Sequence, residues 1–298
     1  MVVTQTLLFG TLAFARAAIG VEGLSVPVYD IASDCTDPRL PALAGPWIVE
    51  CARGGQVTGA VHIPSGDRVT LPRPLPRPGL ADSALYGPSR DGGLFLLRRD
   101  GVHEVAGAVA IHGTLSAPAA TDGEHIAVLV DGHIQAFPAT ERTRRKWPTT
   151  ARGWYPPALS WPVVAWVTEQ DGDEDVQWID LAGDLGPQVL SGGPGHQRHV
   201  VGSATHLAWV EDQALVIWSA QTHERTIIPT ETGFSAPPTL WEGTACWEER
   251  TANNGIDLRC SDGMAVRAPG HQQHPSRYGP WLLYREGDRL MLYTAPSQ

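Results

Sequence analysis

Short apolar runs recur along the whole chain, and turns rich in Gly, Pro, Asn or Asp separate them. Each run has the length of a β-strand. The clearest unit spans 195–220, where His206–Glu211 and Ala214–Trp218 are two apolar strands around a turn, and a third short run follows at 226–228. Comparable runs start 36 to 43 positions apart, at 47–49, 83–85, 125–128, 163–166, 206–209, 245–247 and 282–284.

A period near 40 residues with about four short strands per unit is typical of the blades of a β-propeller. Such a sheet cannot bury both faces alone, so neighbouring sheets pack around a closed ring. Trp166, Trp209 and Trp247 occupy equivalent places in three repeats, and we expect them to pack between blades. The sequence therefore predicts an all-β fold, a single β-propeller over residues 21–298. We count seven blades, or six if the degenerate second repeat forms none.

The last repeat has three strands where the others have room for four. Residues 24–31 alternate like a strand and precede the first repeat without a partner of their own. We expect this N-terminal strand to complete the last blade beside 289–293. This pairing would close the ring and remove an exposed sheet edge.

Residues 1–18 resemble a signal peptide. The apolar stretch Leu7–Ala15 is followed by small residues, with Ala15 and Ala17 at the positions of a cleavage site, although the usual basic residues are missing. The stretch is too short to predict a membrane span. A buried N-terminal strand or helix is the alternative. The leader predicts an exported protein, periplasmic or secreted, that is not transmembrane after cleavage.

The four cysteines agree with export. Cys246 and Cys260 flank a predicted hairpin and are equidistant from Asn253, so they would lie opposite one another on paired strands, close enough for a disulfide. By elimination Cys35 would pair with Cys51; two unpaired cysteines on an apolar face are the alternative for the hairpin. No CxxC spacing occurs in the sequence, so it offers no support for a zinc or thioredoxin-like site.

Composition and charge limit the classes of partner that the protein can bind. Hydrophobic residues make up 42% of the chain, which is ample for a core, and the 32 Gly and 25 Pro fall between the apolar runs as turns. The net charge of −10 argues against nucleic acid, because binding it requires positive charge that neutralises phosphates.

The repeat resembles that of the TolB-like propellers, whose units run from a Pro/Ser lead-in through an apolar strand and a charged turn to a closing strand. Residues 155–160, 163–166 and 170–181 follow this order well, and 253–258 follow it in part. The resemblance implies a propeller fold and a periplasmic setting. It does not imply the role of TolB itself, since the helical domain that precedes the propeller there is missing from this sequence.

Two matching motifs are the strongest candidates for chemistry. His196, Gln197 and His199 lie in one, and the equivalent residues His271, Gln272 and His274 lie in the other. Both precede a first strand, which in a propeller lines the channel, and imidazole suits Mn, Fe or Zn. Oligogalacturonate lyases of similar architecture hold a metal with His and Gln, although here the motifs are two blades apart. The alternative is a repeat consensus whose side chains bond to neighbouring backbone.

Two charged segments complete the candidates. Asp171, Asp173 and Asp175 resemble the start of a calcium loop, but Val176 and Ala182 replace the Gly and Glu of an EF-hand, so a solvated hairpin turn is the alternative. A basic cluster is either a solvated outer strand or a contact for an acidic partner or glycan; it consists of Arg142, Arg144, Arg145 and Lys146.

The function that these patterns favour is a non-catalytic, exported scaffold that binds a protein or a cell-envelope component. We expect no resident cofactor in that case. One alternative is a metal-dependent, lyase-like enzyme on a glycan that uses the His/Gln motifs. Another is a lectin-like carbohydrate binder, although that would require the same polar residues in most blades and they occur in two.

Overall fold

The computed structural model describes residues 25–30, 35, 39–52, 54–76, 78–87, 93–108, 111, 115, 117–141, 145–150, 155–183, 185–230, 233–234, 236–251, 255–268 and 270–295.

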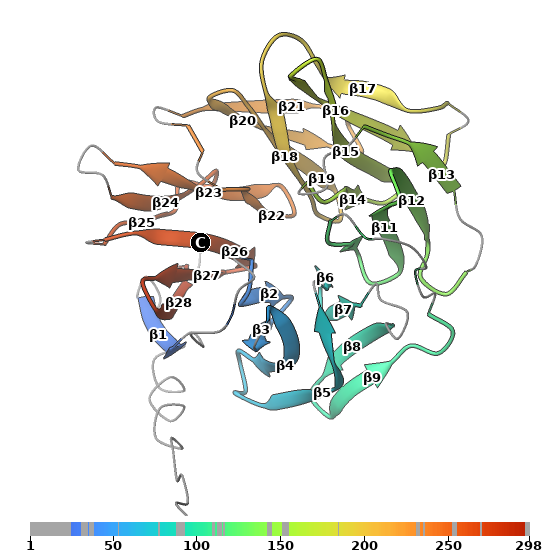
Figure 1. Cartoon of the computed structure of the whole chain (residues 1–298). Coiled ribbons are helices and arrows are strands. Elements are labelled where there is room, and N and C mark those ends of the chain that lie inside the picture. The colour runs from blue at the N-terminus through green and yellow to red at the C-terminus, as the bar shows by residue number, and fades with distance from the viewer. Residues whose placement is uncertain are drawn as a thin grey trace, which may run out of the picture.

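Seven four-stranded antiparallel sheets surround a common centre as the blades of a β-propeller (Figure 1). This confirms the predicted fold and the count of seven. From the inner to the outer strand, the blades are β2 (Ala42–Ala44), β3 (Trp47–Ala52), β4 (Gln56–His62), β5 (Arg68–Pro76); β6 (Gly79–Ala81), β7 (Ala84–Tyr86), β8 (Leu94–Arg98), β9 (Gly101–Glu104); β10 (Ala120–Thr121), β11 (His125–Val130), β12 (His133–Pro138), β13 (Arg145–Pro148); β14 (Ala158–Ser160), β15 (Val163–Gln170), β16 (Asp173–Asp180), β17 (Gln188–Ser191); β18 (Gln197–Gly202), β19 (His206–Glu211), β20 (Ala214–Ser219), β21 (Arg225–Pro229); β22 (Thr239–Trp241), β23 (Thr244–Arg250), β24 (Ile256–Cys260), β25 (Ala265–Val266); and β26 (Gln272–Tyr278), β27 (Trp281–Glu286), β28 (Arg289–Thr294), β1 (Ser25–Asp30).

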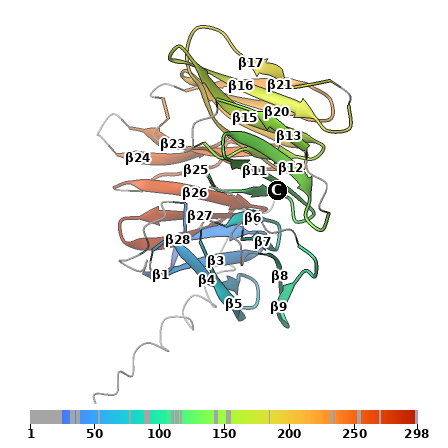
Figure 2. The same cartoon turned by 45° about the vertical axis from the view of Figure 1, so that its right-hand side comes forward.

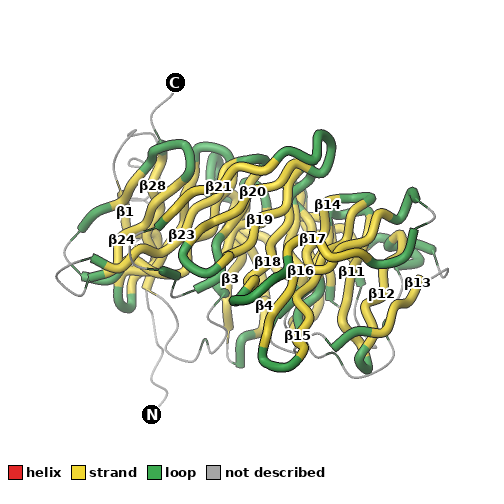
Figure 3. The backbone as a smooth tube through the Cα atoms, turned by 90° about the horizontal axis from the view of Figure 1, so that it is seen from above, coloured by secondary structure: helices red, strands yellow, loops and turns green. Residues whose placement is uncertain are grey.

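The described residues consist of strands and loops, without a helix (Figure 3). None of them forms a helix long and apolar enough to cross a bilayer. The hairpins between second and third strands turn tightly because their first turn residue adopts a left-handed backbone, as at Asp131, Asp171 and Asp212. Asp tolerates this conformation, and the tight turn sets the register of the strands that follow.

Seven apolar clusters fill the seven seams between blades. Successive strand residues point to opposite faces, so each blade contributes to two seams. Trp166, Trp209 and Trp247 are buried and each packs against the preceding blade. The predicted role of these three residues in packing between blades is therefore confirmed.

The N-terminal strand closes the ring. β1 pairs antiparallel with β28, and Val26 lies opposite Leu292. The two strands lie side by side in Figures 1 and 2. Val28 is 9% exposed and joins Leu290 and Leu292 of blade 7 with Ile48 of blade 1 in one cluster. The strand thus completes blade 7 and helps to bury the seam between the first and last blades.

Two disulfides have the pairing that the sequence predicts. Cys246 lies directly opposite Cys260 in the β23–β24 hairpin, and the Cα atoms are 4.0 Å apart. Cys35 is bonded to Cys51 on β3, which ties the segment after β1 to blade 1. Asn253, the expected centre of the hairpin, and the leader at 1–18 lie outside the described residues.

Candidate functional site

The first His/Gln motif lies in the seam between blades 4 and 5. His196 forms a parallel β-bridge with Glu174 on β16, and its Nδ1 lies 3.2 Å from the Oε2 atom of Glu174. The carboxylate of Glu174 is buried, and the Tyr155 hydroxyl donates to its other oxygen at 3.0 Å. His196 thus contacts the third strand of blade 4, while Gln197 and His199 lie on β18, the inner strand of blade 5.

His199 of this motif is the residue at which β18 departs from regular pairing with β19. The register shifts between Arg198 and Val201, and His199 has a φ of 59°. Its ring meets the Tyr155 ring edge-on, with 5.4 Å between centroids. Burial, reinforced by the Arg198 charge, lowers the pKa of His199 to about 4, although Glu174 acts in the opposite direction. His199 is therefore neutral at physiological pH.

The second motif repeats this arrangement between blades 6 and 7. His271 forms a parallel bridge with Ile256 on the third strand of blade 6. Gln272 is fully buried, and its amide nitrogen donates to the Ala268 carbonyl at 3.1 Å. His274 has a φ of 54° at an equivalent register shift, and its backbone N–H donates to the buried Glu248 carboxylate at 2.8 Å.

The environment of His274 also disfavours its charged form. Burial lowers the pKa of His274; the Glu248 carboxylate raises it, and the Arg285 guanidinium lowers it. The two motifs are thus equivalent local structures in separate seams, and a metal site at the channel mouth stays a prediction. Within the described ranges, no three His, Cys, Asp or Glu side chains gather as a metal-binding group would require.

The three aspartates of the calcium-like segment have different structural roles. Asp171 forms the β15–β16 turn, and the Asp173 carboxylate accepts a hydrogen bond from the Gly195 N–H at 3.1 Å. Asp175 Oδ1 is buried. In the basic cluster, Arg145 donates to the Leu181 carbonyl at 2.7 Å and Lys146 is exposed on β13, whereas Arg142 and Arg144 lie outside the described residues.

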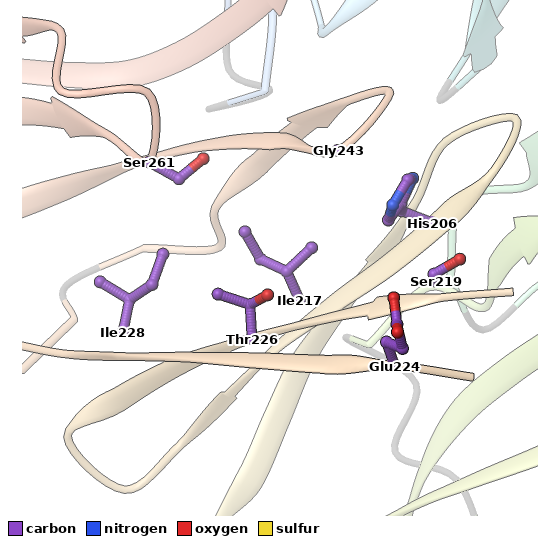
Figure 4. A pocket seen from close by; sticks show the side chains of 8 residues that line it. All are labelled: His206, Ile217, Ser219, Glu224, Thr226, Ile228, Gly243 and Ser261. Carbon is purple, nitrogen blue, oxygen red and sulfur yellow. The ribbon is translucent and has the colours of Figure 1, made fainter. Parts of the chain in front are cut away.

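A pocket of about 270 Å³ lies between blades 5 and 6 (Figure 4). His206, Ser219 and Glu224 gather at one end of it. Ile217 and Ile228 provide an apolar wall, and Gly243 and Ser261 of blade 6 lie across from them. The remaining lining residue is Thr226, on β21. The pocket therefore combines an acidic end with an apolar wall.

The outer strands of blades 4 and 5, and the loop before β17, expose apolar side chains. Leu185, Val189 and Ile227 are 71%, 57% and 63% exposed, the large hydrophobic residues that stand out at the surface of the described chain. Arg225 on β21 donates to the Leu190 carbonyl on β17, so the two outer strands are linked. Val189 and Ile227 thus lie on the outer strands of two neighbouring blades. We call Leu185, Val189 and Ile227 the apolar edge.

Neither the pocket nor the apolar edge follows from the sequence motifs. The pocket residues come from two blades and look like ordinary strand and turn residues in the sequence. One sequence feature that was available is the Thr-Ile-Ile run at 226–228, which forms the middle of the outer strand β21.

No family model and no curated protein matches this chain. The resemblance to TolB-like repeats therefore stays a prediction. Solved structures do match. Virginiamycin B lyase from Staphylococcus aureus is 14% identical with a TM-score of 0.50, over 92% of this chain and 99% of that chain.

Two further structures are similar. A chain of the Mitotic Checkpoint Complex is 12% identical with a TM-score of 0.55, over 94% of this chain and 96% of that chain. BamB from Moraxella catarrhalis is 12% identical with a TM-score of 0.42, over 85% of this chain and 81% of that chain. At such identities the likeness extends to the fold alone, and this chain has the fold of a seven-bladed β-propeller.

Proposed function

We propose that this protein is an exported, non-catalytic β-propeller that binds a protein or another component of the cell envelope. The observation that carries the proposal is the apolar edge on blades 4 and 5. Single exposed hydrophobic residues are normal on protein surfaces, but exposed apolar side chains on adjoining strands are typical of interaction sites.

Burial elsewhere in the molecule supports this role. Each seam between blades is filled by its own apolar cluster. Neither Val189 nor Ile227 belongs to the clusters beside blade 5, so burying those seams does not require them. Exposure at these two positions therefore has no structural benefit within the chain. Covering them with a partner would remove apolar surface from water and favour association.

The two disulfides support the proposed location. Disulfides form and persist in oxidising compartments and are rare in the cytosol. Together with the signal-peptide prediction for residues 1–18, Cys35–Cys51 and Cys246–Cys260 favour a periplasmic or secreted protein.

Site-specific photocrosslinking in cells that export the protein tests the proposal. A photoreactive phenylalanine analogue at Val189 or at Ile227 should give the same discrete protein adduct. The analogue at Lys146, which is exposed on the outer strand of blade 3, is the matched control and should not give that adduct. An identical adduct pattern at all three positions, or no adduct at any, would contradict the proposal.

The metal-dependent alternative has a separate test, metal analysis of the purified protein. A stoichiometric transition metal that is lost in both His199→Ala and His274→Ala would overturn the non-catalytic role. We expect no such metal, because each motif is engaged with the carboxylate of a different preceding blade.

A further inference from the structure

We propose that β21 binds an extended segment of a partner protein as an added antiparallel or parallel strand, and that a basic side chain of this segment enters the pocket between blades 5 and 6. This inference rests on the proposed function and names the partner's chemistry. It follows from the free backbone of β21, from the apolar edge and from the charge of the pocket.

The backbone of β21 has outward-facing hydrogen-bonding groups. Ser219 N–H donates to the Glu224 carbonyl at 3.0 Å, and Thr230 N–H donates to the Gln213 carbonyl at 2.8 Å. Bonding alternates along an antiparallel pair, so Thr226 and Ile228 bond to β20. The N–H and C=O groups of Arg225 and Ile227 therefore point away from the blade. A strand added there would satisfy them.

Four of the other outer strands, β1, β5, β13 and β25, are less suited to pairing, and β9 and β17 have four residues each against five in β21. Natural sheets protect their edges with proline, charge or short length. Three prolines interrupt β5, β1 contains Pro27, and Arg145 and Lys146 lie on β13. β25 has two residues. β21, by contrast, presents Thr-Ile-Ile at 226–228, and its only proline is the last residue.

The two faces of β21 would select alternate side chains of the added strand. Thr226 and Ile228 line the pocket together with Ile217 and Ser219 of β20. Ile227 points to the opposite face, where Val216, its partner across the sheet, packs against blade 4. An added strand would therefore place one set of residues beside the pocket and the other beside Ile227.

The pocket favours a positive charge. Glu224 lies at one end, and no Lys or Arg is among its described lining residues. Arg225, next in sequence, lies on the other face above the Trp209 ring, 5.5 Å from the centroid. A lysine or arginine side chain would pack its aliphatic stem on Ile217 and Ile228 and bring its charge to Glu224. The opposite face of the segment would present apolar residues to Ile227.

Two blocked peptides test this in the intact chain, Thr-Val-Lys-Val-Lys-Val-Thr and its counterpart with Glu in place of Lys. Binding is followed through backbone amide shifts in NMR titrations. The lysine peptide should perturb residues 224–228, and the glutamate peptide should bind at least about tenfold more weakly, a difference of about 1.4 kcal/mol. Glu224→Gln should weaken the lysine peptide about fivefold.

The sharpest variant is Ile227→Pro, because it removes an outward N–H and leaves the β20–β21 ladder intact. We expect it to weaken the lysine peptide at least about tenfold without unfolding the protein. Lys146→Pro is the control. Thr149 N–H donates to the Gly132 carbonyl, so Lys146 also faces outward, on another blade. This variant should bind the lysine peptide like the unaltered chain.

Equal binding of the two peptides, no binding of either, or equal effects of the two proline variants would overturn the inference. A concentration-dependent dimer in sedimentation that Ile227→Pro abolishes would also overturn it, since a second copy would then occupy β21.

The two proposals can fail separately. If the crosslinked adduct at Val189 persists while the lysine peptide fails to bind, the scaffold role is supported and strand addition is contradicted. If no adduct forms but the peptide binds with the expected selectivity, the proposed cellular role is contradicted and the binding site on β21 is supported.

Discussion

The outermost strands of blades 7 and 5 show two outcomes for the same structural position. In blade 7 the strand beside β28 is β1, which comes from the other end of the chain and buries Val28 in the seam with blade 1. In blade 5 the outermost strand is β21, which continues its own blade and exposes Ile227. Both strands are the last of a four-stranded blade, but β1 covers a seam with its side chains, whereas β21 leaves Ile227 in water. The difference separates what holds the ring together from what is available to a partner.

The largest expected effect is the loss of the closing strand. Deletion of residues 21–32 should lower the free energy of unfolding by more than about 4 kcal/mol, because it uncovers Leu290 and Leu292 and leaves the last blade with three strands. Urea unfolding followed by tryptophan fluorescence measures the change. Deletion of residues 296–298, which follow β28, is the control and should have little effect. A 21–32 deletion that unfolds like the full chain would show that the ring does not depend on β1.

One substitution made in both strands compares the two edges directly. Val28→Asp should destabilise the protein by about 3 kcal/mol, because it places a carboxylate in the apolar seam between blades 7 and 1. Ile227→Asp should change the stability by less than about 0.5 kcal/mol, because that side chain is already in water. Both values come from the same denaturant titration. Similar losses at the two positions would mean that β21 is as well covered as β1.

A smaller effect concerns pH and the inner side of blade 5. The folded-state pKa of His199 is about 4, against about 6.5 when the chain is unfolded, so the unfolded chain binds the extra proton first as the pH falls. This contribution to stability is complete above pH 6.5 and is lost as the pH falls toward 4, by at most about 3 kcal/mol.

His199→Asn is the variant that isolates this effect. Asn tolerates the positive φ at this position and does not titrate. Its unfolding free energy should fall less than that of the unaltered chain between pH 6.5 and 4. An unchanged slope in this window would assign the acid sensitivity to other groups.

The sequence predicted the parts of the fold that repeat. A period of about 40 residues placed the blades, Trp166, Trp209 and Trp247 marked the seams, and equal distances from a turn placed Cys246 opposite Cys260. The closing strand followed because the last repeat was one strand short. Each of these inferences needed only the pattern within a repeat or the difference between repeats.

Contacts between repeats could not be predicted in the same way. The His/Gln motifs could be found, but not their contacts, since His196 and His271 bridge to the third strand of the preceding blade while the residues after them begin inner strands. The Tyr278 hydroxyl lies 3.2 Å from an Asp82 carboxylate oxygen, although 196 positions separate the two residues. The pocket likewise forms between two blades, where Gly243 and Ser261 of blade 6 lie across from Ile217 of blade 5. A repeat pattern specifies what each blade contains, whereas these features depend on how neighbouring blades fit together.

Amide hydrogen exchange at Leu292 and Ile227 measures most directly which strand edge is covered and which is open. The Ala295 N–H donates to the Pro280 carbonyl, so by alternation the Leu292 N–H faces β1, as the Ile227 N–H faces away from β20. Leu292 lies on the third strand of blade 7, which β1 covers, whereas Ile227 lies on the outermost strand of blade 5. We expect strong protection of Leu292 and exchange of Ile227 near the rate of an unstructured amide, with the neighbouring Ile228 protected. Fast exchange at Leu292, or protection of Ile227 in the purified monomer, would contradict this expectation.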